Sequence, residues 1–101
     1  MHLANVFRRW LSLLGRRAHR RDAAALRVDW RVFGSGVHHV STTGDFAPGG
    51  AFVHTPDAKP AGSPIVLDVE TPRGERVTMH ARVAWSGLRG MGLRFTRAWS
   101  R

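Results

Sequence analysis

The sequence predicts a small all-β protein, a six-stranded antiparallel β-barrel or sandwich preceded by an N-terminal amphipathic helix. Apolar residues alternate with polar residues in several short runs, and clusters of glycine, proline and aspartate separate these runs. Alternation that leaves one apolar face fits a closed barrel whose interior is filled by side chains. With 101 residues, the chain has room for one domain with one core.

The alternating runs place the expected strands. The clearest run is 75–85, in which Val77 to Trp85 supply one apolar face and His80 lies on the other. Residues 43–50 contain an aspartate, a proline and three glycines, and they are expected to form a loop. No aromatic platform is expected on the outer face. The predicted strands are 26–32, 37–43, 51–54, 65–70, 75–85 and 91–95.

Residues 1–15 are predicted to form the amphipathic helix, which ends at Gly15. Its apolar stripe is expected to pack on the barrel or on a second copy of the chain. A basic helix of this kind also suits an anionic membrane surface, or a partner that orders it. The stripe follows helical spacing through Leu3, Val6, Phe7, Trp10, Leu11 and Leu14.

The formal net charge of +9 is unevenly distributed. Residues 1–21 hold six arginines and no acidic residue, and 16–25 read as an arginine-rich hinge before a barrel domain at 26–101. No run approaches the roughly 18 apolar residues that a membrane span needs. The apolar run at 10–14 is too short for a signal peptide, so a cytoplasmic protein is expected.

Catalytic and metal chemistry are not expected. The absence of cysteine excludes a disulfide scaffold, a thiolate zinc site and a cysteine nucleophile. His38 and His39 are adjacent, so on a strand they point to opposite faces and cannot share a metal ion. Asp68 and Glu70 share a face that is better explained as a solvated strand surface than as an acid–base pair. We therefore expect no enzyme activity, no metal and no cofactor.

Two segments carry the functional signal. The first is RRAHRR at 16–21, and the second is DFAPGGAFV at 45–53. Together with Val83-Ala84-Trp85 and the GMGLRF run at 90–95, they make the chain resemble the PilZ domains, which bind the bacterial second messenger cyclic di-GMP. The arginines resemble the RxxxR motif of that family, and the second segment resembles its D/NxSxxG motif at the first and last positions. The resemblance runs from about residue 16 to residue 96.

The resemblance implies a six-stranded barrel with the ligand on its outer surface, where a mobile arginine segment wraps over it. Family members often bind cyclic di-GMP as an intercalated pair. Arginine forks suit guanine edges and phosphates, a carboxylate accepts guanine N–H donors, and glycines allow close backbone approach. Two registers of RxxxR fit, Arg16/Arg20 and Arg17/Arg21, and the first also gives RRxxR. The expected ligand-binding residues are Arg16, Arg17, Arg20, Arg21, Asp45, Ala47, Gly49 and Gly50.

Ala47 departs from the family motif, which has serine at this position. The loss of one hydroxyl should weaken binding by roughly 0.5–1.5 kcal/mol. The expected function is a cyclic di-GMP receptor that signals to an as yet unidentified protein partner by ordering its arginine segment. The alternatives are a degenerate PilZ-type adaptor that has lost the nucleotide, and a small basic barrel that binds nucleic acid. The last is disfavoured because the charge is concentrated in one segment.

Overall fold

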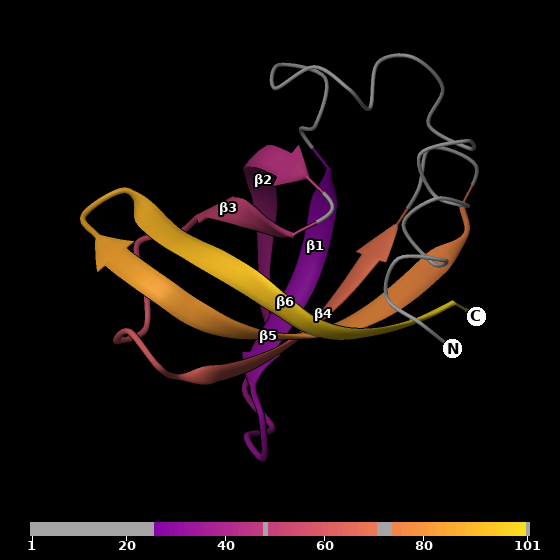
Figure 1. Ribbon diagram of the computed structural model, residues 1–101, viewed down its shortest axis with the longest axis horizontal. Coiled ribbons are helices and arrows are strands. Elements are labelled where there is room, and N and C mark those ends of the chain that lie inside the picture. The colour runs from indigo at the N-terminus through magenta and orange to yellow at the C-terminus, as the bar shows by residue number, and fades with distance from the viewer. Residues whose placement is uncertain (1–25, 48, 71–73, 101) are drawn as a thin grey trace.

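Six antiparallel strands form a closed barrel in the computed structural model, which describes residues 26–47, 49–70 and 74–100 (Figure 1). Around the wall the strands run β1-β2-β3-β6-β5-β4. The six-stranded barrel predicted from the sequence is confirmed, whereas the predicted helix and the arginine-rich hinge lie outside the described residues. The strands are β1 Arg27–Val32, β2 His39–Ala47, β3 Gly50–His54, β4 Pro64–Glu70, β5 Arg76–Gly87 and β6 Gly90–Ser100.

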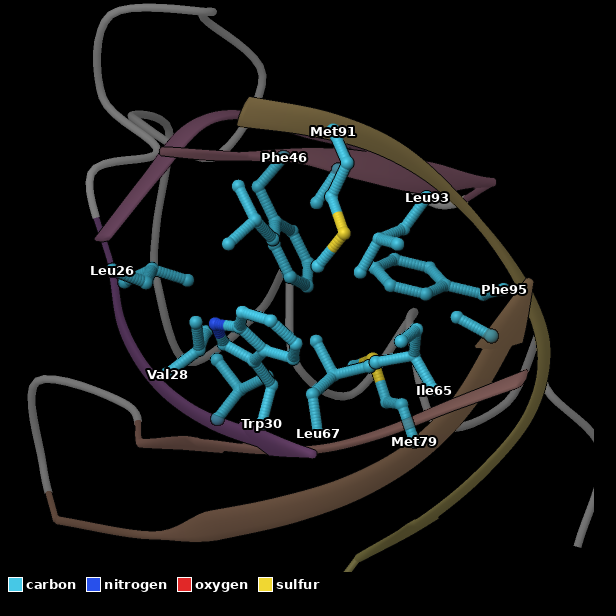
Figure 2. Packing of buried hydrophobic residues seen from close by; sticks show 14 of the residues in the cluster. Leu26, Val28, Trp30, Phe46, Ile65, Leu67, Met79, Met91, Leu93 and Phe95 are labelled. Atoms are coloured by element: carbon cyan, nitrogen blue, oxygen red, sulfur yellow. The ribbon is translucent and has the colours of Figure 1, made fainter. Parts of the chain in front are cut away.

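The interior of the barrel is filled by apolar side chains from all six strands (Figure 2). Trp30 is fully buried and is the largest of them; its indole Nε1 donates a hydrogen bond to Ser41 Oγ at 3.0 Å. Side chains alternate between the two faces of a strand, so one set points inward and fills the interior, as expected for a small barrel without a channel. The core comprises Leu26, Val28, Trp30, Phe46, Ala51, Val53, Ile65, Leu67, Val69, Val77, Met79, Ala81, Val83, Met91, Leu93 and Phe95.

β2 is longer than predicted. The sequence places a loop at 43–50, but the strand continues to Ala47 because an irregularity in its pairing with β3 falls between Thr43 and Phe46. A bulge of this kind accommodates an extra residue and bends the strand without ending it. Phe46 consequently points into the core, where its ring lies 5.4 Å from that of Phe95.

β5 and β6 form a long hairpin whose pairing has two irregularities, and the one nearer the turn reverses the prediction for Trp85. The register shifts between Val83 and Trp85, so Trp85 pairs with Gly92 and its side chain is 53% exposed. The expectation that Trp85 shares the apolar face of Val77 is therefore wrong. Simple alternation fails here because the bulge places two successive residues on the outer side of the wall. β6 also runs further than the predicted 91–95, to Ser100.

Leu26 fixes the place where the N-terminal segment joins the barrel. Its backbone N–H donates to Thr43 Oγ1 at 2.9 Å, and its carbonyl accepts from the Thr43 N–H at 2.9 Å. Thr43 is buried, so this pair of bonds is shielded from water. The N-terminal segment therefore joins the barrel beside the middle of β2. The part of the chain that the structure describes contains no helix that could cross a membrane.

Candidate functional site

A shallow pocket of about 320 Å³ opens on the outer surface of the barrel, on β2, β3, β5 and β6. The four predicted arginines precede Leu26 and lie outside the described residues. The other four predicted ligand-binding residues all line this pocket, although they were identified by a sequence motif alone. These are Asp45, Ala47, Gly49 and Gly50.

The hairpin between β2 and β3 forms one side of the pocket. Ala47 pairs with Gly50, so only two residues connect the strands. The carbonyl of Gly49 accepts a hydrogen bond from the N–H of Phe95 at 2.9 Å, which ties the hairpin to β6. A Cβ atom at Gly50 would collide with the backbone carbonyl of Leu93. Glycine at this position therefore brings the backbone of β3 close against β6, and a ligand can approach the backbone here.

Two stacked aromatic rings border the pocket. The rings of Phe52 and Trp85 have centroids 5.3 Å apart and an interplanar angle of 20°. Trp85 lies over Gly92, where any Cβ atom would overlap its indole nitrogen. The expectation that the strands carry no outward aromatic platform is therefore wrong. Aromatic rings often pack over glycines on neighbouring strands, but the pairing of Trp85 with Gly92 follows from the register shift after Val83, which the alternation in the sequence does not indicate.

A third ring extends this platform along β3. His54 contacts Phe52 edge to face, with centroids 4.8 Å apart. Both rings lie against Gly44, because a Cβ at that glycine would come within 2.7 Å of His54 Nε2 and 3.0 Å of the Phe52 ring. The aromatic row, defined as His54, Phe52 and Trp85, thus covers two glycines of the wall, Gly44 and Gly92.

The charges around the pocket are distributed unequally. β3, β5 and β6 contain no acidic residue, whereas β2 contributes the exposed carboxylate of Asp45. A single carboxylate, that of Asp45, therefore lies beside the aromatic rings, and the other residues of these four strands are neutral or basic. This combination suits a flat ligand that has N–H donors on its edge.

A second hollow, on the outer face of the barrel, contains charges of both signs. It is lined by two arginines and three acidic residues, and the Thr78 hydroxyl donates a hydrogen bond to the Asp68 carboxylate. This agrees with the prediction of a solvated polar surface for Asp68 and Glu70. The charged lining residues are Arg27, Asp29, Asp68, Glu70 and Arg76.

The adjacent histidines contact different carboxylates. His38 Nδ1 lies 2.7 Å from Asp29, and His39 Nδ1 lies 3.7 Å from Asp57. His39 also stacks on the ring of Trp30, with centroids 4.1 Å apart. Within residues 26–47, 49–70 and 74–100, no three histidine or acidic side chains are grouped so that they could hold a metal ion.

A closed barrel with a filled interior and a pocket on its wall defines a class of small binding modules that hold their ligand on the surface. The family model of the PilZ domain matches residues 15–98. The chain belongs to the PilZ domain family, a family of cyclic di-GMP-binding domains that is not a known family of enzymes. No curated protein matches the chain in sequence.

Proposed function

We propose that this protein is a receptor for cyclic di-GMP, which binds in the pocket formed by β2, β3, β5 and β6. The observation that carries the proposal is that Asp45, Gly49 and Gly50 share this pocket with the stacked rings of Phe52 and Trp85. A guanine base has N–H donors on one edge and two aromatic faces. The pocket supplies an acceptor for the edge and rings for a face.

The contribution of each group can be stated in physical terms. The carboxylate of Asp45 is an acceptor only, so it favours guanine over bases that present acceptors on the same edge. Stacking a base on an aromatic side chain is worth about 1–3 kcal/mol. Ala47 offers no hydroxyl to the ligand, which leaves one hydrogen bond fewer than the serine of the family motif provides.

The arginine segment is long enough to reach the pocket. Arg20 lies six residues before Leu26, and six extended residues span about 20 Å. Leu26 is bonded to Thr43, and Asp45 lies two residues further along β2, about 7 Å away. The guanidinium groups of Arg16, Arg17, Arg20 and Arg21 are therefore proposed to cover the ligand from outside and to bind its phosphates and guanine edges.

Ligand binding would then act as a signal through the N-terminal segment. Residues 16–25 would be drawn onto the pocket, which changes how the helix predicted at 1–15 is presented to a protein partner or to a membrane surface. Ordering of a segment by ligand phosphates is an established means of switching. An intercalated pair of cyclic di-GMP molecules, as the family often binds, would supply more phosphates for the four arginines.

Isothermal titration of the full chain with cyclic di-GMP tests the proposal. We expect heat of binding at tens of micromolar protein, and affinities at least about tenfold lower for Arg20→Ala and Asp45→Ala. Arg8→Ala and Asp57→Ala are the charge-matched controls and should bind like the wild type. If the folded wild type releases no heat, the receptor proposal is wrong and the degenerate adaptor is favoured.

A second candidate function is the binding of single-stranded nucleic acid. The specific observation in its favour is the outward aromatic row on strands without acidic residues, because bases of any sequence stack on such rings. A gel shift with single-stranded and duplex DNA at physiological salt separates the two functions. Retention of a complex at that salt would support this candidate, since non-specific phosphate binding weakens steeply with salt.

A further inference from the structure

Two arginines face each other on the outer wall beside the pocket. Arg94 of β6 pairs with Gly50 of β3 on one side and with Arg82 of β5 on the other. Both arginine side chains are exposed, whereas the neighbours Leu93 and Phe95 point into the core. Like charges directly opposite each other on antiparallel strands destabilise a sheet. The pair therefore costs stability unless an anion lies between the two guanidinium groups.

Among the described residues, no carboxylate forms an ion pair with either arginine. Neither β5 nor β6 contains an acidic residue. Arg82 is held by a hydrogen bond from its guanidinium to the carbonyl of Gly62 at 2.9 Å, in the connection between β3 and β4. Within the described ranges, the guanidinium of Arg94 makes no ion pair and no hydrogen bond. Arg82 is thus oriented, and Arg94 keeps all its donors available.

The spacing of this arginine pair from the aromatic row fits one nucleotide. Closer to the β5–β6 turn, Gly92 of β6 pairs with Phe52 of β3 on one side and with Trp85 of β5 on the other. Gly92 and Arg94 are two residues apart on one strand, so the arginine pair lies about 7 Å along the wall from Phe52 and Trp85. The phosphate of a nucleotide lies at a comparable distance from its base. A base stacked on Trp85 with its sugar directed along β6 towards Arg94 would therefore place its phosphate at the arginine pair.

We propose that Arg94, supported by Arg82, binds a phosphate group of the cyclic dinucleotide whose base stacks on Trp85. The inference rests on the proposed function, and it adds a phosphate subsite on the barrel to the arginines of the N-terminal segment. A guanidinium presents parallel N–H donors that match two phosphate oxygens, and an ionised acceptor makes these bonds short and strong. The bound phosphate also removes the repulsion between the two arginines.

Titration of the full chain with cyclic di-GMP at physiological salt tests the subsite. Arg94→Ala should weaken binding about tenfold, and the double variant Arg82→Ala/Arg94→Ala should weaken it further. Arg94→Lys should recover only part of the affinity, because an ammonium lacks the planar fork. Arg76→Ala is the matched control, since it removes the same charge from the far end of β5 and should leave binding unchanged. Thermal unfolding shows whether each variant is folded.

The outcomes separate this inference from the proposed function. Wild-type binding that is lost in Asp45→Ala but unchanged in folded Arg94→Ala overturns the phosphate subsite and leaves the receptor intact. An equal loss in Arg76→Ala and Arg94→Ala also overturns it, because the effect is then one of net charge. Loss of single-stranded DNA binding alone in Arg94→Ala would assign the pair to nucleic acid instead. Absence of wild-type binding removes both proposals together.

Discussion

Trp30 and Trp85 are the same side chain on the two sides of one barrel wall. Trp30 is fully buried, donates its indole N–H to Ser41 and stacks on His39. Trp85 is 53% exposed, stacks on Phe52 and covers Gly92. The inner tryptophan fills the space between six strands, whereas the outer one rests on a glycine and leaves a ring face open. Removal of the inner ring should therefore affect stability, and removal of the outer ring should affect ligand binding.

Truncation of the two tryptophans has the largest expected effect and tests this comparison directly. Trp30→Ala should lower the free energy of unfolding by about 3–5 kcal/mol, because it leaves a large cavity in the only core cluster that the described residues form. Trp85→Ala should leave the urea midpoint nearly unchanged but weaken cyclic di-GMP binding by about 1–3 kcal/mol. Urea unfolding and titration of both variants check this. A large loss of stability in Trp85→Ala would show that the outer ring is structural.

Two glycines on the outer wall provide a finer test. Gly50→Ala places its Cβ against the backbone carbonyl of Leu93, which cannot move without β6, so a loss of about 1–3 kcal/mol in stability is expected. Gly92→Ala places its Cβ against the exposed Trp85 ring, which can rotate away. This variant should therefore keep its melting temperature and lose ligand affinity. Similar melting temperatures for the two variants would contradict the distinction between backbone and side-chain neighbours.

Ala47→Ser tests a gain on the outer wall. The added hydroxyl restores the serine of the family motif within the pocket and should strengthen cyclic di-GMP binding by roughly 0.5–1.5 kcal/mol, about tenfold at most. Because Ala47 is exposed, thermal unfolding should hardly change. Ala84→Ser, which also lies in the pocket lining but outside the motif, is the control. Equal affinities for Ala47→Ser and the wild type would show that this position does not contact the ligand.

The smallest expected effect concerns pH. Burial, together with the charges of Arg97 and Arg31, lowers the pKa of His80 below its ordinary value. As the pH falls through about 6.5, the unfolded chain therefore takes up a proton at this site more readily than the native state, and the native state loses stability. His80→Gln removes this contribution. The drop in urea midpoint between about pH 7.5 and pH 5.5 should be smaller in the variant than in the wild type; an equal drop would exclude a role for His80.

The inner face could be predicted from the sequence because period-two alternation follows directly from strand geometry. Val28, Trp30 and Leu67 are buried as their alternation indicates. Four of the predicted site residues also share a pocket, since Asp45 to Gly50 are close in the chain and flank a short hairpin. The positions of the four arginines stay a prediction, because they precede Leu26.

The outer aromatic row could not be predicted from alternation, since it depends on two bulges. Between Thr43 and Phe46 a bulge keeps β2 in the sheet through a segment whose glycines and proline indicated a loop. Between Val83 and Trp85 a bulge turns the tryptophan outward. Period-two reasoning assumes that every residue advances the ladder by one, so one unpaired residue reverses the expected face of all that follow.

Closure of the sheet also limits how another protein can recognise this domain. Each of the six strands is hydrogen-bonded to a neighbour on both sides along part of its length, which closes the wall. Within this closed part, an extended peptide from a partner cannot bind by strand addition, which requires unpaired N–H and C=O groups along an edge strand. Among the described residues, β6 from Arg97 to Ser100 pairs with β5 alone, so an edge of this kind is present at the end of β6. Where the wall is closed, a protein partner must contact the outward side chains, and the same closure protects this part of the wall against edge-to-edge association of its copies.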